Sequence, residues 1–162
     1  MKSAKPSFDL INVMPSFLIG KNELVTNIKD ITRGTNGPFL LAALGNIAET
    51  PNPSTTVYVN DVAKIEVLAL DSSVEGNQNF LVSSGGIEGT TWNDALDIIR
   101  CNYPEAVKKG IFSLKGSQPT KRTKVDCSKA EKTFGFTLAS YETQVKSVVD
   151  HYLELTGSGK EI

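Results

Sequence analysis

The chain has 162 residues, a formal net charge of −1, 40% hydrophobic residues and 22% charged residues. At roughly 150 residues per domain, this length predicts one domain with a core that needs no disulfide or metal. The ordinary composition excludes a disordered or collagen-like chain, and the balanced charge argues against a strongly basic nucleic-acid binder. No apolar run reaches about 18 residues, so we predict no membrane span and expect a cytoplasmic protein.

The chain has few of the cysteine and histidine residues that metal sites and nucleophilic triads require. Cys101 and Cys127 stand apart from any His or Cys pattern, which is typical of two reduced thiols in a cytosolic protein. A zinc site needs about four ligands, and the chain has a single histidine, His151. We therefore predict no metal site. His151 lies in a late amphipathic stretch, which also argues against a histidine-based triad.

The first predicted elements mix strands and helices. Phe8–Met14 carries apolar residues on both sides of an extended chain, which predicts a parallel strand buried on both faces. Pro15 is expected to end it, because proline cannot donate to a ladder. Ser16–Gly20 is predicted to be a loop that is too apolar for a free surface, so we expect it to line a pocket or to pack against another part of the protein. Glu23–Thr32 has helical spacing, and a helix over Phe39–Leu44 should follow.

The middle of the chain predicts two more strands and one helix. Thr55–Val59 is β-branched and aromatic, and Asn79–Ser83 is short and apolar, so both are expected strands. Between them a helix is predicted over Val62–Leu70. Either Asn60 or Asp61 should cap that helix.

The second half is predicted to be mostly helical. Its expected elements are a helix over Trp92–Asn102 capped by Thr90 or Thr91, an edge strand over Ile111–Leu114, a short helix opened by Asp126 or Ser128 and ended by Gly135, and a helix over Tyr141–Leu155 capped by Ser140. This order predicts the α/β class with few strands. We expect a single domain over residues 1–156 and a flexible tail over 157–162.

Two segments resemble a known family. The first, NVMPSFLIG over residues 12–20, is a strand that ends in a proline-containing turn with an apolar tail and a glycine. The second, TVYVNDVAK over residues 56–64, is a V-x-V-x-D-V-A junction of strand and helix. Three later segments are also similar to that family's C-terminal sequence: DCSKAEK over residues 126–132, FGF over 134–136 and SYE over 140–142. Together they resemble the C-terminal half of fungal-type extended short-chain dehydrogenases/reductases, including NAD-dependent epimerase/dehydratases and dihydroflavonol-reductase-like enzymes.

Two hallmarks of that family are absent. The Gly-rich turn that seats a pyrophosphate on a helix N-terminus is missing, since the cluster Gly85–Gly89 has a different spacing. The Tyr-x-x-x-Lys pair is missing as well, because no tyrosine has a lysine four residues later; the four tyrosines are Tyr58, Tyr103, Tyr141 and Tyr152. The resemblance therefore implies a truncated Rossmann-like domain with few, partly parallel strands plus a helical substrate-binding region.

The resemblance also implies a site. In the family, the backbone of the proline turn lies beside the nicotinamide carboxamide, and the adjacent loop walls the substrate pocket. Pro15 and Leu18 would be the remnant of the cofactor contact. The turn could equally be no more than a buried connection. Tyr58 and Asn60 are further candidates, because they lie at a strand end, where α/β pockets form. The substrate-pocket candidates are thus Met14, Pro15, Ser16, Phe17, Leu18, Tyr58 and Asn60.

We expect the chain to bind a small hydrophobic molecule and not to transfer hydride alone, with NADP or NAD entering only if a partner half supplies the missing motif. The alternatives are a cofactor-independent isomerase or cyclase acting on a natural-product-like substrate, and a non-catalytic binding module, so enzymatic activity stays open. A central parallel strand without neighbours would expose apolar edges. We therefore predict a homodimer or association with an N-terminal half.

Overall fold

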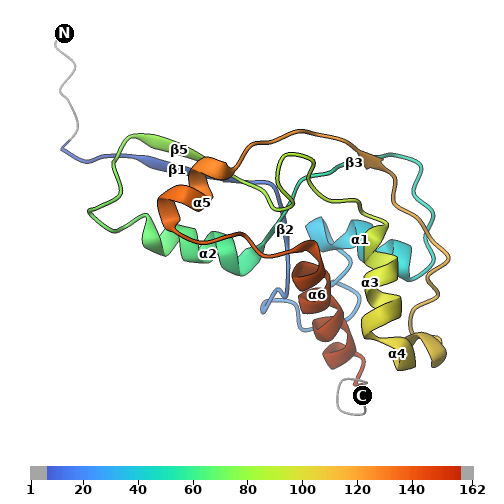
Figure 1. Ribbon diagram of the computed structural model, residues 1–162. Coiled ribbons are helices and arrows are strands. Elements are labelled where there is room, and N and C mark those ends of the chain that lie inside the picture. The colour runs from blue at the N-terminus through green and yellow to red at the C-terminus, as the bar shows by residue number, and fades with distance from the viewer. Residues whose placement is uncertain (1–6, 158–162) are drawn as a thin grey trace, which may run out of the picture.

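The computed structural model describes residues 7–157, so the predicted tail beyond Gly157 lies outside the described residues. Figure 1 shows a sheet region and a helical region side by side. The elements in chain order are β1 (Ile11–Pro15), β2 (Phe17–Ile19), the 3-10 turn η1 (Gly34–Asn36), α1 (Gly37–Ala43), β3 (Asn52–Pro53), β4 (Thr56–Tyr58), α2 (Val59–Leu68), β5 (Gln78–Val82), α3 (Asp94–Asn102), α4 (Pro104–Lys108), β6 (Thr120–Lys121), α5 (Ser128–Phe134) and α6 (Tyr141–Leu155).

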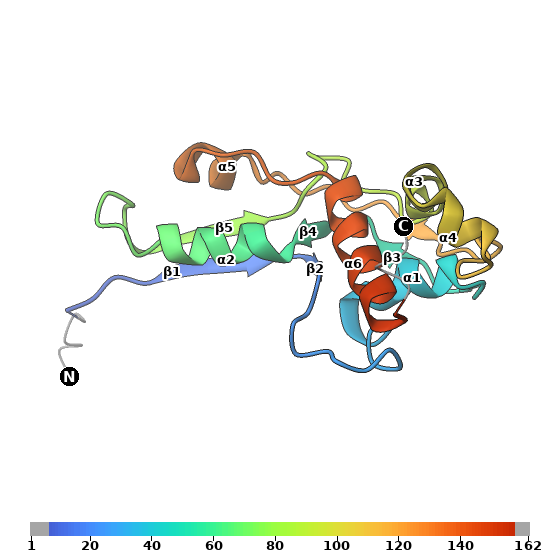
Figure 2. The same ribbon diagram turned by 90° about the horizontal axis from the view of Figure 1, so that it is seen from below.

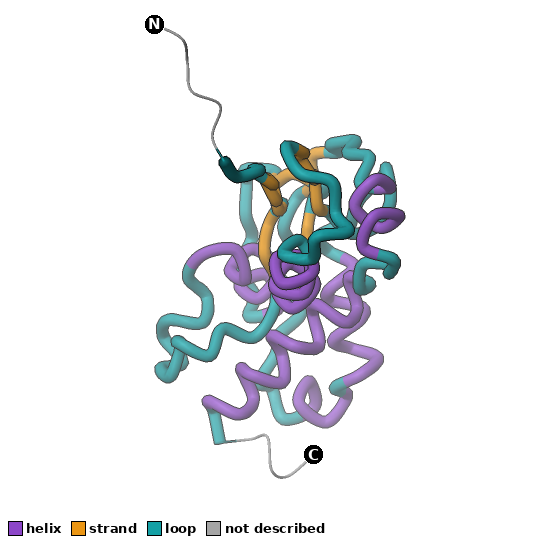
Figure 3. The backbone as a smooth tube through the Cα atoms, turned by 90° about the vertical axis from the view of Figure 1, so that its left-hand side faces the viewer, coloured by secondary structure: helices purple, strands orange, loops and turns teal. Residues whose placement is uncertain are grey.

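The described strands form three parallel pairs: β1 with β5, β2 with β4, and β3 with β6. Figure 3 shows the strands gathered toward one end and most helices toward the other. The α/β class with few parallel strands is thus confirmed. Among residues 7–157, no helix has the length and apolar character to cross a bilayer, and no three His, Cys, Asp or Glu side chains gather as metal ligands would.

The β1–β5 pair is covered on one face only. Val13 and Phe80 are register partners whose side chains join a cluster with α2 and α5. Their strand neighbours Met14 and Leu81, also register partners, point the other way and are 42% and 48% exposed. Figure 1 shows α2 and α5 on one side of the pair and no described element on the other. The predicted burial of this strand on both faces is therefore wrong within the described chain.

Strand β1 ends at Pro15, as predicted, with Pro15 itself as its last paired residue. It pairs in register with Val82, and the next residue, Ser16, donates its N–H to the Val82 carbonyl. Because successive N–H groups of a strand point to opposite sides, the nitrogen of Pro15 faces the edge away from β5. A residue without an N–H is tolerated at that position.

The helical region encloses a second core. Trp92 is fully buried, with Phe17 and Tyr141 packed edge-to-face on its ring at centroid distances of 5.6 and 6.3 Å. The indole N–H donates to the carbonyl of Pro53 at 2.8 Å, so its polar atom is satisfied. Figure 2 shows α1, α3, α4 and α6 gathered at this end of the molecule.

The predicted helix over Glu23–Thr32 is absent, and two asparagines explain why. The side-chain oxygen of Asn22 accepts from the N–H of Leu24, and that of Asn27 accepts from the N–H of Lys29. Such Asx turns offer the backbone an alternative to helical bonding. Residues 21–33 consequently form a chain of turns.

Several boundaries also differ from expectation. Helix α2 begins at Val59 with neither Asn60 nor Asp61 as a cap, and α3 begins at Asp94, after the threonines expected to cap it. Ser16–Gly20 contains strand β2, and Ile111–Leu114 is not a strand. The remaining predictions are confirmed to within a few residues: α1, β4, β5, α5 with Gly135 in the left-handed conformation after it, and α6 with Ser140 accepting from the Thr143 N–H.

Candidate functional site

A groove of about 770 Å³ lies where the two regions meet. Its walls come from the ends of β2 and β4, the start of α2, the turns over residues 20–36 and one residue of α6. Ligands of α/β proteins bind beyond the carboxyl ends of parallel strands, and this groove has that position. Its lining residues are Leu18, Gly20, Lys21, Asn22, Glu23, Leu24, Arg33, Gly34, Thr35, Asn36, Tyr58, Val59, Asn60 and Ser147.

The junction of β4 and α2 supplies the polar pair of the groove. Tyr58 is the last residue of β4, and Asn60 lies in the first turn of α2, so the backbone bends between them. The Asn60 amide donates to the Tyr58 hydroxyl oxygen at 3.1 Å. That oxygen accepts this hydrogen bond, and the hydroxyl proton of Tyr58 remains available for another acceptor.

Asn36 fixes the floor of the groove. Its side chain accepts from the N–H of Gly20 at 3.1 Å and donates to the carbonyl of the same residue at 2.8 Å. Gly20 has φ +151°, and a Cβ built there would lie 2.6 Å from a methyl group of Val59. A glycine is therefore required where β2 ends, and the buried Asn36 amide holds it from both sides.

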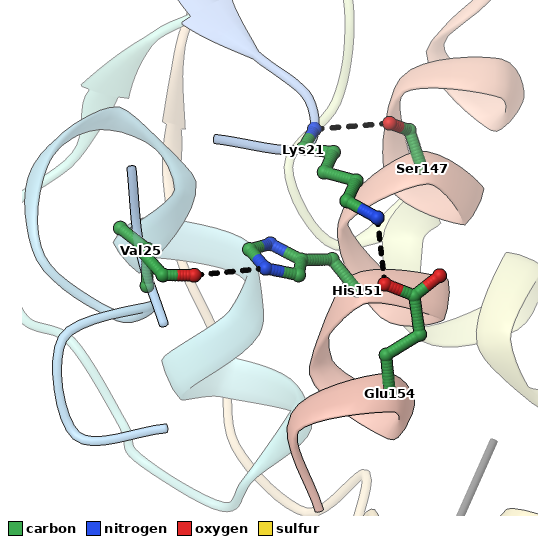
Figure 4. A network of polar contacts seen from close by, with 5 residues as sticks. All are labelled: Lys21, Val25, Ser147, His151 and Glu154. Atoms are coloured by element: carbon green, nitrogen blue, oxygen red, sulfur yellow. Dashed lines mark hydrogen bonds and ion pairs between the residues drawn. The ribbon is translucent and has the colours of Figure 1, made fainter. Parts of the chain in front are cut away.

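One face of α6 holds the outer wall. Figure 4 shows Ser147, His151 and Glu154 reaching toward the turns that follow β2. The Ser147 hydroxyl accepts from the N–H of Lys21 at 3.0 Å, and His151 Nε2 lies 3.1 Å from the carbonyl oxygen of Val25. Glu154 pairs with the Lys21 ammonium at 2.6 Å. This bond raises the pKa of Lys21 and lowers the pKa of Glu154.

The predicted pocket residues separate into two groups. Leu18, Tyr58 and Asn60 line the groove. Met14 and Pro15 lie on β1 and are exposed on the sheet, and Phe17 packs against Trp92. The Ser16 hydroxyl is enclosed without a hydrogen-bond partner. The proline turn thus contributes Leu18 alone to the groove lining.

Asp61 has a different role from the predicted cap. Its carboxylate accepts from the N–H of Ala139 at 2.6 Å. The bond joins α2 to the segment between α5 and α6, and so fixes the position where α6 begins. The acidic residue of the V-x-V-x-D-V-A segment is therefore a structural tie.

The glycine cluster after β5 does not form a pyrophosphate cradle. The cluster folds back on itself, because a Cβ on Gly85 would lie 2.6 Å from the carbonyl oxygen of Gly89. The loop ends in further turns before α3 begins at Asp94, so no strand–glycine–helix cradle for a pyrophosphate forms there.

Sequence reasoning missed Asn36, Lys21 and the α6 face. The Arg-Gly-Thr-Asn-Gly-Pro run was visible, but its glycines and proline indicate only a break in structure. The α6 residues Ser147, His151 and Glu154 follow a helical spacing, which predicts a shared face but not what that face contacts.

Curated relatives match nearly the whole chain. Ketoreductase CTB6 of Cercospora beticola is 39% identical over 158 residues, covering 96% of this chain and 44% of its own length. The NAD-dependent epimerase/dehydratase ALT6 of Alternaria alternata is 27% identical over 152 residues, with 86% and 42% coverage. The chain thus spans less than half the length of these relatives and matches their C-terminal part. No family model matches it.

Solved structures agree on the fold. Gre2 from Candida albicans superposes with a TM-score of 0.71 at 21% identity, covering 95% of this chain and 47% of that protein. Yeast methylglyoxal/isovaleraldehyde reductase Gre2, solved as an NADPH complex, gives a TM-score of 0.62 with 93% and 47% coverage. The predicted resemblance to the C-terminal half of reductase and epimerase/dehydratase proteins is confirmed.

Proposed function

Because the chain is a relative of ketoreductases and NAD-dependent epimerase/dehydratases and corresponds to their C-terminal part, we propose that it is the small-molecule-binding portion of an NAD(P)-dependent reductase-like protein. It binds its ligand in the groove beside Tyr58 and transfers no hydride alone. The observation that carries the proposal is the prepared groove: Asn36 clamps Gly20, Asn60 orients the Tyr58 hydroxyl, and α6 holds the outer wall.

A covering partner belongs to the same proposal. Met14 and Leu81 leave an apolar strip on one face of the β1–β5 pair, and Leu10 next to β1 is 56% exposed. Among the described strands, β1 pairs with β5 alone, so its other edge is open. Parallel strands are normally covered on both faces. We propose that the portion of the reductase fold absent from this chain covers this face, and that a second copy does so in the isolated chain.

Complementation tests both parts. The chain would be mixed with a separately produced N-terminal part of Ketoreductase CTB6, and NADPH oxidation followed with isovaleraldehyde as the probe. We expect oxidation in the mixture only, and Leu81→Lys should abolish it by blocking assembly. NADPH oxidation by the chain alone would contradict the proposal.

A second measurement does not depend on assembly. Isovaleraldehyde added to the ¹⁵N-labelled chain should shift the amides of Leu18, Asn36 and Asn60, while those of the distant α4 stay unmoved. Absence of shifts in the groove would reject a binding function. Isomerisation of a probe by the chain alone, with no nicotinamide present, would instead favour the isomerase or cyclase alternative.

A further inference from the structure

We infer that a second lobe of the groove, along α6, binds a neutral, hydroxyl-bearing part of the ligand. This inference rests on the proposed function and adds the ligand's chemistry. The lobe has a volume of about 570 Å³. Its lining residues are Lys21, Tyr58, Ser140, Glu142, Thr143, Lys146, Ser147, Asp150 and Glu154.

The two lobes belong to one groove. Lys21, Tyr58 and Ser147 line both of them. These residues come from the turn after β2, the end of β4 and the middle of α6, so three separate elements meet at the junction. A ligand longer than one ring can therefore contact both lobes.

Two hydroxyl protons are available at this junction. The Tyr58 oxygen accepts from the Asn60 amide, and the Ser147 oxygen accepts from the Lys21 N–H. Within residues 7–157, neither hydroxyl donates a hydrogen bond to a protein acceptor. Each is thus oriented by a bond that it accepts and keeps its own proton for a ligand oxygen.

The charged groups of the second lobe are largely occupied. Glu154 pairs with the Lys21 ammonium at 2.6 Å, and Asp150 accepts from the Tyr103 hydroxyl at 2.6 Å. Each carboxylate still has unused lone pairs that can accept from a ligand hydroxyl. The lining holds three acids and two lysines, Lys21 and Lys146, so its formal charge is negative and disfavours an anionic ligand group relative to a neutral one.

These features select one kind of group. A neutral hydroxyl can accept from Tyr58 or Ser147 and donate to a carboxylate at the same time. An ether oxygen can only accept, and a carboxylate is disfavoured by the negative formal charge of the lining. The second lobe therefore matches a phenol or alcohol and discriminates against its methylated or acidic counterpart.

Three small probes test this match. Resorcinol, 1,3-dimethoxybenzene and 3-hydroxybenzoate would be titrated into the ¹⁵N-labelled chain. We expect resorcinol to shift the Thr143 and Ser147 amides with a Kd at least fivefold lower than that of either other probe. Removing one donor in Tyr58→Phe or Ser147→Ala should each raise that Kd about fivefold, as one neutral hydrogen bond does. Tyr152→Phe, outside both lobes, is the matched control.

The outcomes separate the inference from the proposed function. If resorcinol shifts only first-lobe amides such as Asn36, or if 3-hydroxybenzoate binds as tightly, the inference is wrong and the binding function stands. If no probe, isovaleraldehyde included, shifts either lobe, the binding function fails with it. The melting temperatures of Tyr58→Phe and Ser147→Ala should equal that of the wild type. Equal values would exclude misfolding as the cause of a raised Kd.

Discussion

The helical region and the sheet region bury their cores in different ways. Trp92 and its neighbours sit among four helices, and the polar atom of the indole has a partner in Pro53. Phe80 also has no exposed surface, but the helices that cover it, α2 and α5, lie on one face of the sheet only. The register partners on the other face, Met14 and Leu81, remain open to solvent.

The difference indicates that the core of the helical region forms on folding, whereas the open face of the sheet region is left for assembly with a partner. The helical region surrounds its core, with Trp92 fully buried among side chains of α1, α3, α4 and α6. The sheet region has apolar surface left over, as a piece of a larger sheet would. The ligand groove lies between them, with Tyr58 at the start of α2 and Ser147 on α6. Its geometry therefore depends on the complete region as well as the incomplete one.

The strongest test of the closed core is Trp92→Ala. The substitution removes the largest fully buried side chain and leaves the Pro53 carbonyl without its donor. We expect a loss of about 3–5 kcal/mol in the free energy of unfolding, measured by urea denaturation. Trp92→Phe, which keeps most of the ring volume, should lose less. A loss below about 1 kcal/mol for the alanine variant would mean that this core is loosely packed.

Two adjacent residues of β5 compare the two faces of the sheet directly. Phe80 is fully buried and its ring lies 4.9 Å from that of Phe134, whereas Leu81 is 48% exposed. Phe80→Ala should cost about 3 kcal/mol. Leu81→Ala should change the free energy of unfolding by less than about 0.5 kcal/mol at low protein concentration.

Sedimentation of the Phe80→Ala and Leu81→Ala variants compares the two faces of the sheet in self-association. Leu81→Ala should weaken self-association of the isolated chain, because it removes part of the apolar strip. Phe80→Ala should leave the association constant unchanged wherever the variant stays folded. A wild-type chain that sediments as a monomer at high concentration would contradict the proposed cover by a second copy.

Patterns within one element were predictable from the sequence, and contacts between elements were not. The Tyr141–Leu155 helix with its Ser140 cap follows from spacing and a local hydrogen bond, and both are confirmed. The failures have local causes that outweigh periodicity. The side chains of Asn22 and Asn27 bond to the backbone two residues on, so the helical spacing of the apolar residues over 23–32 does not produce a helix.

The groove residues likewise could be predicted only where the signal lies within one segment of the sequence. Tyr58 and Asn60 were predicted because they lie where a strand ends, a place where α/β pockets form. Leu18 was predicted from the resemblance of the proline turn to a known family. Asn36 was missed because its partner is the backbone of Gly20, 16 residues earlier in the chain. Lys21 and Glu154, which are 133 residues apart, gave no signal as a pair. Only the folded chain brings such residues together.

Asn36 tests how far the groove depends on its floor. Asn36→Ala removes both bonds to Gly20 and leaves a buried backbone N–H and carbonyl without partners. We expect a loss of roughly 1–3 kcal/mol in the free energy of unfolding and weaker isovaleraldehyde binding. Asn36→Asp, which keeps the acceptor and loses the donor, should fall between wild type and alanine. Equal binding in all three would show that the groove forms without this clamp.

The smallest expected effect concerns the tether between Lys21 and Glu154. The hydrogen bond to Lys21 lowers the pKa of Glu154, so the tether stabilises the fold above the ordinary glutamate pKa of 4.5 and is lost as pH falls through the lowered value. At the other end, the bond to Glu154 raises the pKa of Lys21 above 10.5, and the tether is lost again as pH rises through that raised value.

Both partners are exposed at the surface, where ion pairs contribute little, so the effect should be local. We expect the ¹³C carboxyl signal of Glu154 to titrate below 4.5 in the wild type and to return toward 4.5 in Lys21→Met. The Val25 N–H, which donates to the carbonyl of Asn22, should lose protection from hydrogen exchange in the same variant, while α3 stays protected. A Glu154 titration that is unchanged by Lys21→Met would show that the ion pair does not persist in solution, and that Ser147 and His151 alone hold this wall of the groove.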